Sequence, residues 1–196
     1  MNVATDERTE IAAAMRGSVE RSALTQADFA RHMGTSAARL STYLSGKTIP
    51  SAAIYLRALR LGNALEFARK HGFMTPDDAA DAVNRALAEG DEDFAIRMIL
   101  QARDDLRAST NESSEVRPAW DRRAKHIDDD RFDTLFRAII AHEFGEQVPA
   151  WAADAQLAED WVVEDPFRSP EAIRAQTPRW LARAHIYIAE RGLTTA

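Results

Sequence analysis

The sequence predicts a mainly α-helical protein, with a five-helix N-terminal domain followed by a helical hairpin and a small helical C-terminal domain. The first observation is that apolar residues recur three and four positions apart, which is the spacing of one face of an α-helix. The second is that Ser, Thr or Asp precedes many of these stretches and Gly follows them, as at helix starts and ends. The third is a length of 196 residues with 45% hydrophobic residues, which suits one or two small globular domains.

The composition excludes several classes of protein. There are no cysteines, so disulfides, thiolate zinc sites and thiol catalysis are excluded, and a cytoplasmic protein is favoured. No run approaches the roughly 18 consecutive apolar residues of a transmembrane helix. Residues 1–10 lack the basic flank and apolar run of a signal peptide. We therefore expect a cytoplasmic protein with no membrane partner.

Charge is distributed unevenly along the chain. The net charge is −6, but residues 1–62 hold eight Lys/Arg and five Asp/Glu, a net of +3. The remaining residues hold 17 Lys/Arg and 26 Asp/Glu, a net of −9. A basic head suits a phosphate backbone, whereas an acidic body suits a different partner.

The N-terminal domain, residues 7–72, is predicted from cap residues and apolar spacing. Thr25 and Ser36 are good N-caps, and Gly34 and Gly46 follow the apolar positions of two short helices. The predicted helices cover residues 7–20, 26–33, 37–45, 51–61 and 63–71.

The rest of the chain is predicted to hold fewer and less regular helices. A helical hairpin is expected over residues 73–107, with helices at 76–89 and 91–106, and the polar segment 108–118 is predicted to be a linker. The C-terminal domain, 119–196, has one strong helix at 130–144. Beyond it, prolines predict short helices and loops around an aromatic core, with a short extended stretch at 185–188. The tryptophans of this core, Trp151, Trp161 and Trp180, could alternatively line a ligand pocket.

Residues 24–47 form the most informative stretch, because two short helices are separated by a tight turn. The outward face of the second helix carries Ala37, Ala38, Ser41 and Thr42. Such small side chains let a helix enter a groove about 12 Å wide, the width of the DNA major groove. The alternative is a helix pair in an ordinary bundle, which would more often expose long charged residues.

This stretch resembles the lambda-repressor/Cro-like (XRE-type) helix-turn-helix domain, and the resemblance extends over about residues 8–70. The matching residues are Thr25-Gln26, Ala30, Gly34, Ser36, Leu40 and Ser45-Gly46-Lys47, followed by Pro50. The resemblance implies a five-helix lambda-repressor-like fold and a sequence-specific transcriptional regulator that binds double-stranded DNA.

The resemblance also implies a DNA-contacting role for each matching position. Gln26 would bond a phosphate, and Lys47 and Thr48 would touch the backbone beyond the helix. Ala37 and Ala38 stand at the leading base-contacting positions, but alanine offers only a methyl group to thymine. Specificity would then depend on other residues and on DNA shape. The full set of expected DNA-binding residues is Gln26, Ser36, Ala37, Ala38, Arg39, Ser41, Thr42, Lys47 and Thr48.

Regulators of this kind usually bind palindromic operators as two-fold dimers. We therefore expect a homodimer, with the apolar helices at 92–106 and 130–144 as candidate interfaces, although stripes of this kind are more often the core of a domain. A repressor is the expected type of regulator.

No catalytic, metal or cofactor site is predicted. His142-Glu143 lacks the second histidine of a metalloprotease motif, and residues 128–133 lack the glycine and closing glutamate of a calcium loop. Ser45-Gly46-Lys47 lacks the glycine-rich loop of a phosphate cradle. We therefore expect no enzymatic activity.

The C-terminal segment 165–193 resembles the tails of helix-turn-helix proteins encoded beside nucleotidyltransferase-like toxins. This resemblance implies an antitoxin that represses its own operon and binds a protein toxin through its acidic part. The alternatives are a phage-type repressor, a ligand-sensing regulator, and a protein-interaction module or enzyme that the head directs to DNA.

Overall fold

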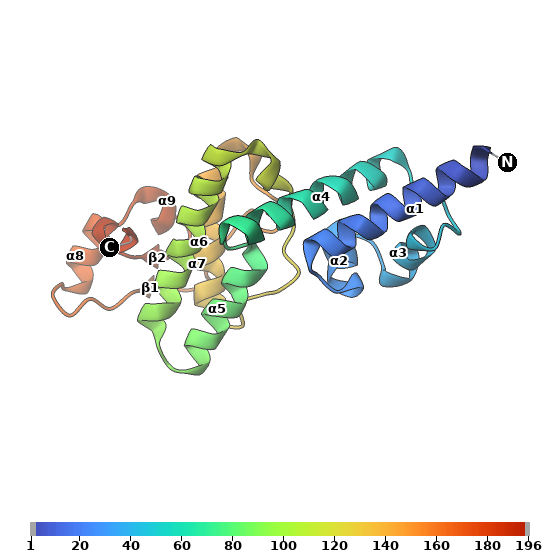
Figure 1. Cartoon of the computed structure of the whole chain (residues 1–196). Helices are drawn as coiled ribbons and strands as arrows, with labels where there is room; N and C mark the ends of the chain where they lie inside the picture. Colours follow the sequence, from blue (N-terminus) through green and yellow to red (C-terminus); the bar gives the residue numbers. More distant parts are fainter. Residues whose placement is uncertain (1–2, 195–196) are drawn as a thin grey trace. The chain divides into compact units, whose positions relative to one another are not determined.

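A computed structural model describes residues 3–194 of the chain (Figure 1). The mainly helical fold predicted from the sequence, with a helix-turn-helix near the N-terminus, is confirmed. The described residues form two compact units. Unit 1 holds the residues up to Thr75 together with 108–124, and unit 2 holds 76–107 and the residues from Lys125 onward.

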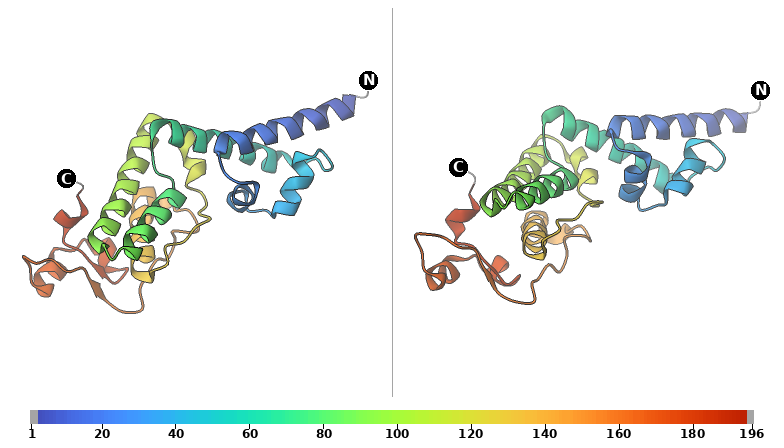
Figure 2. Two further views of the ribbon diagram at one scale, coloured as in Figure 1. Left: turned by 60° about the horizontal axis from the view of Figure 1, so that its bottom comes forward. Right: turned by 90° about the horizontal axis from the view of Figure 1, so that it is seen from below.

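Unit 1 is a small helical bundle around two long helices. α1 and α4 lie side by side, and α2 and α3 pack against them (Figures 1 and 2). Met15, Phe29, Leu40 and Leu61 are at most 2% exposed and form much of the core. The elements of this unit are α1 (Val3–Ser22), α2 (Gln26–Met33), α3 (Ala37–Leu44), α4 (Ala52–His71) and the 3-10 helix η1 (Ser114–Ala119).

The fourth and fifth helices predicted in this region are a single helix, so the predicted break before residue 63 is wrong. α4 runs without interruption from Ala52 to His71 and ends at Gly72, whose φ is +71°. Gly62 lies within α4 and is buried against α1. The glycine therefore marks a close approach of two helices and not a helix end.

The segment 108–118, predicted above to be a linker, has regular secondary structure. α6 (Glu92–Glu112) continues into it, and η1 follows and packs on α4. Val116, Ala119 and Trp120 are at most 1% exposed, so the segment contributes to the core of unit 1. The proposed domain boundaries at residues 72 and 118 stay a prediction about independent folding.

Unit 2 contains three longer helices: α5 (Pro76–Ala88), the first part of α6, and α7 (Asp130–Phe144). α5 and α6 form the predicted helical hairpin, with its turn at Gly90, where φ is +76°. Two ion pairs join α6 to α7. Arg131 at the start of α7 is 2.8 Å from Glu92 at the start of α6, and Arg107 is 2.6 Å from Glu143 near the end of α7. The two helices therefore run parallel.

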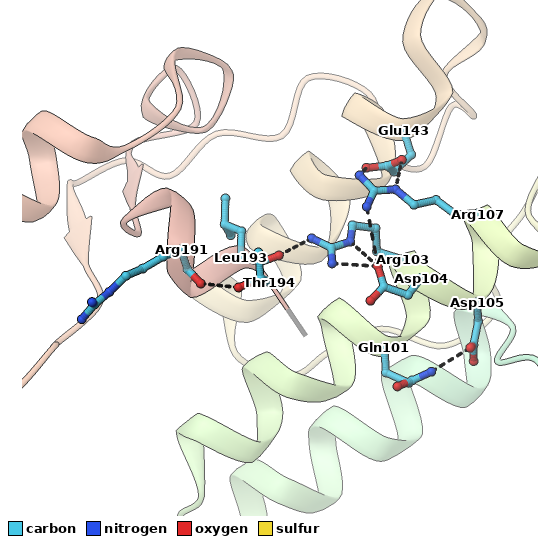
Figure 3. Close-up of polar contacts among 9 residues, drawn as sticks. All are labelled: Gln101, Arg103, Asp104, Asp105, Arg107, Glu143, Arg191, Leu193 and Thr194. Carbon is cyan, nitrogen blue, oxygen red and sulfur yellow. Dashed lines mark hydrogen bonds and ion pairs between the residues drawn. The ribbon is translucent and has the colours of Figure 1, made fainter. Parts of the chain in front are cut away.

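The C-terminal part of unit 2 consists of short elements, as predicted. β1 and β2 pair as parallel strands, with Trp161 opposite Ile186, and β2 lies in the expected extended stretch. Arg103 of α6 is 8% exposed and donates to the Leu193 carbonyl, which fixes the end of the described chain on α6 (Figure 3). The elements are η2 (Gly145–Gln147), β1 (Trp161–Val162), α8 (Pro170–Gln176), α9 (Arg179–Ala182), β2 (Ile186–Tyr187) and η3 (Glu190–Leu193).

The apolar stripes at 92–106 and 130–144 belong to the core of unit 2 and are not exposed to solvent. Ile99, Leu106, Phe132, Phe136 and Ile140 are at most 3% exposed, so these faces are unsuited to the dimer interface considered above.

The tryptophans at 151, 161 and 180 are half-buried and lie in different surroundings. Trp161 and Trp180 line two separate cavities, and the Trp151 ring centre lies 5.5 Å from that of Phe136. Neither of these two cavities is lined by more than one of the three tryptophans.

Within residues 3–194, no helix is long and apolar enough to cross a membrane. The same residues contain no group of three or more His, Asp or Glu side chains that could hold a metal ion.

Candidate nucleic-acid interface

The turn between α2 and α3 is fixed at both sides by local hydrogen bonds. The Thr25 hydroxyl accepts from the Asp28 N–H at 3.1 Å and so caps α2. At the other end Gly34 adopts φ +66°, and the Thr35 N–H donates to the Ala30 carbonyl at 2.9 Å. This left-handed glycine reverses the chain at the point where the sequence predicted a helix end.

α3 begins at the predicted cap and buries one face. The Ser36 hydroxyl accepts from the Arg39 N–H at 3.2 Å. Leu40 is 0% and Tyr43 6% exposed, and they hold the helix against the rest of unit 1. Because these residues point inward, the opposite face of α3 is turned to solvent.

The predicted DNA-contacting residues all belong to this solvent-facing side of unit 1. Thr42 is half-buried, and the other eight are exposed. The exposed residues are Gln26, Ser36, Ala37, Ala38, Arg39, Ser41, Lys47 and Thr48.

Several of these residues lie next to one another. The Gln26 side chain donates to the Ala37 carbonyl at 3.4 Å, which places the first residue of α2 beside the first residue of α3. The Thr42 hydroxyl donates to the Arg39 carbonyl at 2.8 Å, and the Thr48 N–H donates to the Thr42 carbonyl at 3.1 Å. The start and end of α3 are thus each joined to a predicted phosphate-contacting residue.

Two arginines outside the predicted set fix the ends of these helices. Arg57 of α4 donates to the Met33 carbonyl at 3.1 Å, and Arg16 of α1 donates to the Leu44 carbonyl. Each satisfies a carbonyl at a helix C-terminus, where no intrahelical partner exists. Both contacts hold α2 and α3 at a defined angle to α1 and α4.

Sequence reasoning missed Arg122, which lies at the turn of the helix pair. A Cβ added to Gly34 would stand 2.8 Å from the Arg122 Cζ, so the guanidinium lies directly over this glycine. Arg122 is exposed, and it has no hydrogen bond or ion pair within the described part of the chain. No local signal could have predicted this contact, because it depends on the packing of residues 108–124 against the N-terminal helices within unit 1.

The charge difference seen along the sequence is larger between the two units. The segments of unit 1, residues 1–75 and 108–124, hold thirteen Lys/Arg and nine Asp/Glu, a net of +4. Those of unit 2 hold twelve and 22, a net of −10. A polyanion is therefore attracted to unit 1 and repelled by unit 2.

Of three comparisons with known proteins, one gave a match, and it covers the helix pair described above. Comparison with curated proteins and with solved structures gave no match. Residues 10–72 match a family model described as a helix-turn-helix domain. This part of the chain is therefore similar to helix-turn-helix domains, and with the exposed face of α3 the match supports a DNA-binding regulator of the helix-turn-helix type.

Proposed function

We propose that the protein is a sequence-specific transcriptional regulator of the lambda-repressor/Cro-like (XRE) class, which represses its own operon without enzymatic activity. α3 would lie in the major groove of operator DNA, and α2 would cross the backbone. Gln26, Lys47 and Thr48 would contact phosphates. The head, residues 7–72, would be the DNA-binding domain and residues 119–196 the partner-binding domain.

One observation carries this proposal most directly. Gln26 touches the Ala37 carbonyl, so a side chain placed to bond phosphate stands beside the end of α3 that would enter the groove. The leading residues of that end are alanines, which do not obstruct a close approach. The next side chains along the exposed face, Arg39, Ser41 and Thr42, are polar and supply hydrogen bonds to base edges.

A dimer would place two such helices on a palindromic operator, about one helical turn apart. Two large apolar side chains of unit 1 support a contact between copies. Ile49, between α3 and α4, is 49% exposed, and Leu56, near the start of α4, is 45% exposed. Exposed apolar residues of this size are suited to burial against a second copy. Sedimentation of the wild type and of Ile49→Ser/Leu56→Ser tests this point, and an unchanged mass would contradict it.

Binding of the full-length protein to the DNA upstream of its own gene tests the main proposal. We expect Arg39→Ala/Thr42→Ala to weaken specific binding by about 1–3 kcal/mol per lost base contact while leaving binding to unrelated DNA nearly unchanged. Arg69→Ala, an exposed change in the last turn of α4, is the matched control. Equal affinity for specific and unrelated DNA, or no effect of Arg39→Ala/Thr42→Ala, would contradict the proposal.

A second function, that of an antitoxin, is favoured by the charge of unit 2. A net of −10 suits a basic protein partner, for example one directed to nucleic acid. We expect the product of the neighbouring gene to co-purify with the full-length chain and to be inhibited by it. A phage-type repressor or ligand-sensing regulator would show no such partner, and a small molecule that raises the melting temperature would favour the latter.

A further inference from the structure

Unit 2 carries a groove that the proposed DNA interface does not use. Two cavities of about 550 and 350 Å³ share four lining residues and therefore adjoin. The groove they form lies between the first half of α6 and the segment that begins at β1. The shared residues are Asp93, Ile96, Val163 and Glu164.

The floor of the groove is apolar, and exposed phenylalanines stand beside it. Leu100, Ile173 and Ile188 line it and are at most 5% exposed. Phe167, which is 85% exposed, also lines it, and Phe94, which is 39% exposed, follows Asp93 on α6. Exposed aromatic side chains next to an apolar floor mark a surface for another molecule.

The rim of the groove carries a net negative charge, and its narrower part is lined by Arg97 and Arg191 as well as by Asp165. Its wider part is lined by Asp91, Glu92, Asp93 and Glu164. The one guanidinium there, Arg131, is held by Asp129 and Glu92 at 2.9 and 2.8 Å. The rim of the wider part is therefore negative, which is complementary to a positively charged occupant.

One edge of β1 faces away from β2. The N–H groups of Trp161 and Val163 donate to the carbonyls of His185 and Tyr187 at 2.8 and 3.0 Å. Backbone groups alternate between the two edges of a strand, so the N–H and carbonyl of Val162 point to the other edge. Val162 lines the groove, and such an edge can pair with an added strand.

We propose that this groove binds an extended, basic segment of a partner protein, which adds as a strand to the outer edge of β1. Alternate side chains of the added strand would lie on opposite faces, with Lys or Arg beside Asp93 and Glu164 and an apolar side chain against Phe167. The inference rests on the proposal that unit 2 binds a basic protein, and it assigns the groove as the surface that binds this partner. The inference does not depend on DNA binding by unit 1.

A short fluorescent peptide of alternating Lys and Val, titrated with the full-length protein, tests the groove. We expect binding at least about tenfold tighter than that of a Glu-Val peptide, and a loss of about tenfold or more in Asp93→Lys/Glu164→Lys. The matched control is Glu89→Lys/Glu146→Lys, two exposed carboxylates that line neither cavity. Equal binding by all three proteins, or no preference for the basic peptide, would overturn the proposal.

Two further variants test strand addition itself. Phe167→Ser alters a side chain that is 85% exposed, so folding is preserved, and a severalfold loss of peptide affinity is expected. Val162→Pro removes the N–H that would pair with the peptide, at an edge position where proline is tolerated. If neither change lowers the affinity for the peptide, binding is electrostatic only and strand addition is wrong.

The protein partner and a second copy are distinguished by two more measurements. If the neighbouring gene product co-purifies equally with Asp93→Lys/Glu164→Lys, the groove assignment fails while partner binding stands. If it co-purifies with neither protein, the antitoxin proposal fails, and the peptide titration still decides the groove. Self-association that only the wild type shows would make a second copy the occupant and overturn the proposal.

Discussion

Gly62 of α4 lies against the backbone of Ser18 in α1, so closely that an added Cβ would stand 2.7 Å from the Ser18 carbonyl oxygen. Ser18 is fully buried, and its hydroxyl donates to the Ala14 carbonyl at 3.1 Å. The two long helices of unit 1 therefore approach each other at a point where only glycine fits. This crossing sets the position of α4, and α4 in turn holds α2 through Arg57.

Gly62→Ala should destabilise unit 1 by about 1–3 kcal/mol, because the new methyl group meets backbone that cannot move aside. Gly17→Ala is the matched control, since its Cβ would meet only the flexible end of Arg21 at 3.3 Å. We expect that change to be neutral or to stabilise by up to about 1 kcal/mol through helix propensity. Urea unfolding followed by circular dichroism checks both, and equal effects of the two changes would refute the close approach.

Trp120→Ala should destabilise unit 1 by about 3–5 kcal/mol, because the side chain is 1% exposed and leaves a large cavity. Loss of DNA binding on mild warming is the expected functional consequence. Trp180→Ala is the control: this half-buried ring stacks on His142 in unit 2, with ring centres 4.2 Å apart. It should leave DNA affinity unchanged. A Trp120→Ala protein as stable as the wild type would restore the interpretation of 108–118 as a linker.

Arg122→Ala should weaken binding to all DNA sequences alike. The guanidinium lies over Gly34, in the turn that leads into α3, and it has no acceptor within the described residues. A phosphate would provide one. We expect the slope of log K against log salt to fall by about one unit, the value for one phosphate contact. An unchanged slope, equal to that of Arg69→Ala, would show that Arg122 does not reach DNA.

Asp129→Asn should show a stability loss that depends on pH. The Arg131 guanidinium, hydrogen-bonded to the Asp129 carboxylate at 2.9 Å, lowers the pKa of that carboxyl group below its usual value. A lowered folded-state pKa adds stability above the unfolded-state pKa, and this stability is lost as pH falls through the folded-state pKa. Asparagine caps a helix as well as aspartate, so the change isolates the ion pair.

We therefore expect Asp129→Asn to lose roughly 0.5–1 kcal/mol at neutral pH, and the difference from the wild type to vanish well below about pH 4. Chemical unfolding at the two pH values measures this. Asp128→Asn, a change at the exposed neighbouring carboxylate, is the control and should have little effect. An Asp129→Asn loss of the same size at both pH values would exclude the ion pair as its cause.

The sequence by itself determined the elements whose signals are local. Thr25 and Ser36 cap the helices that they were predicted to cap, Gly34 ends α2, and α7 spans 130–144 as expected. These signals need no distant partner, because a cap bonds an N–H three residues away and an apolar stripe is visible within one helix. The exposed face of α3 follows from the same spacing.

Only the tertiary structure decided how distant segments combine. Residues 108–118 are polar enough to resemble a linker, yet residues 108–124 complete unit 1, in which Trp120 is buried. Gly62 resembles a helix break in sequence and is a helix contact in space. The groove of unit 2 joins α6 to the segment that follows β1. Each of these features depends on packing between residues far apart in the chain. Such packing produces no periodic pattern in the sequence of either segment alone.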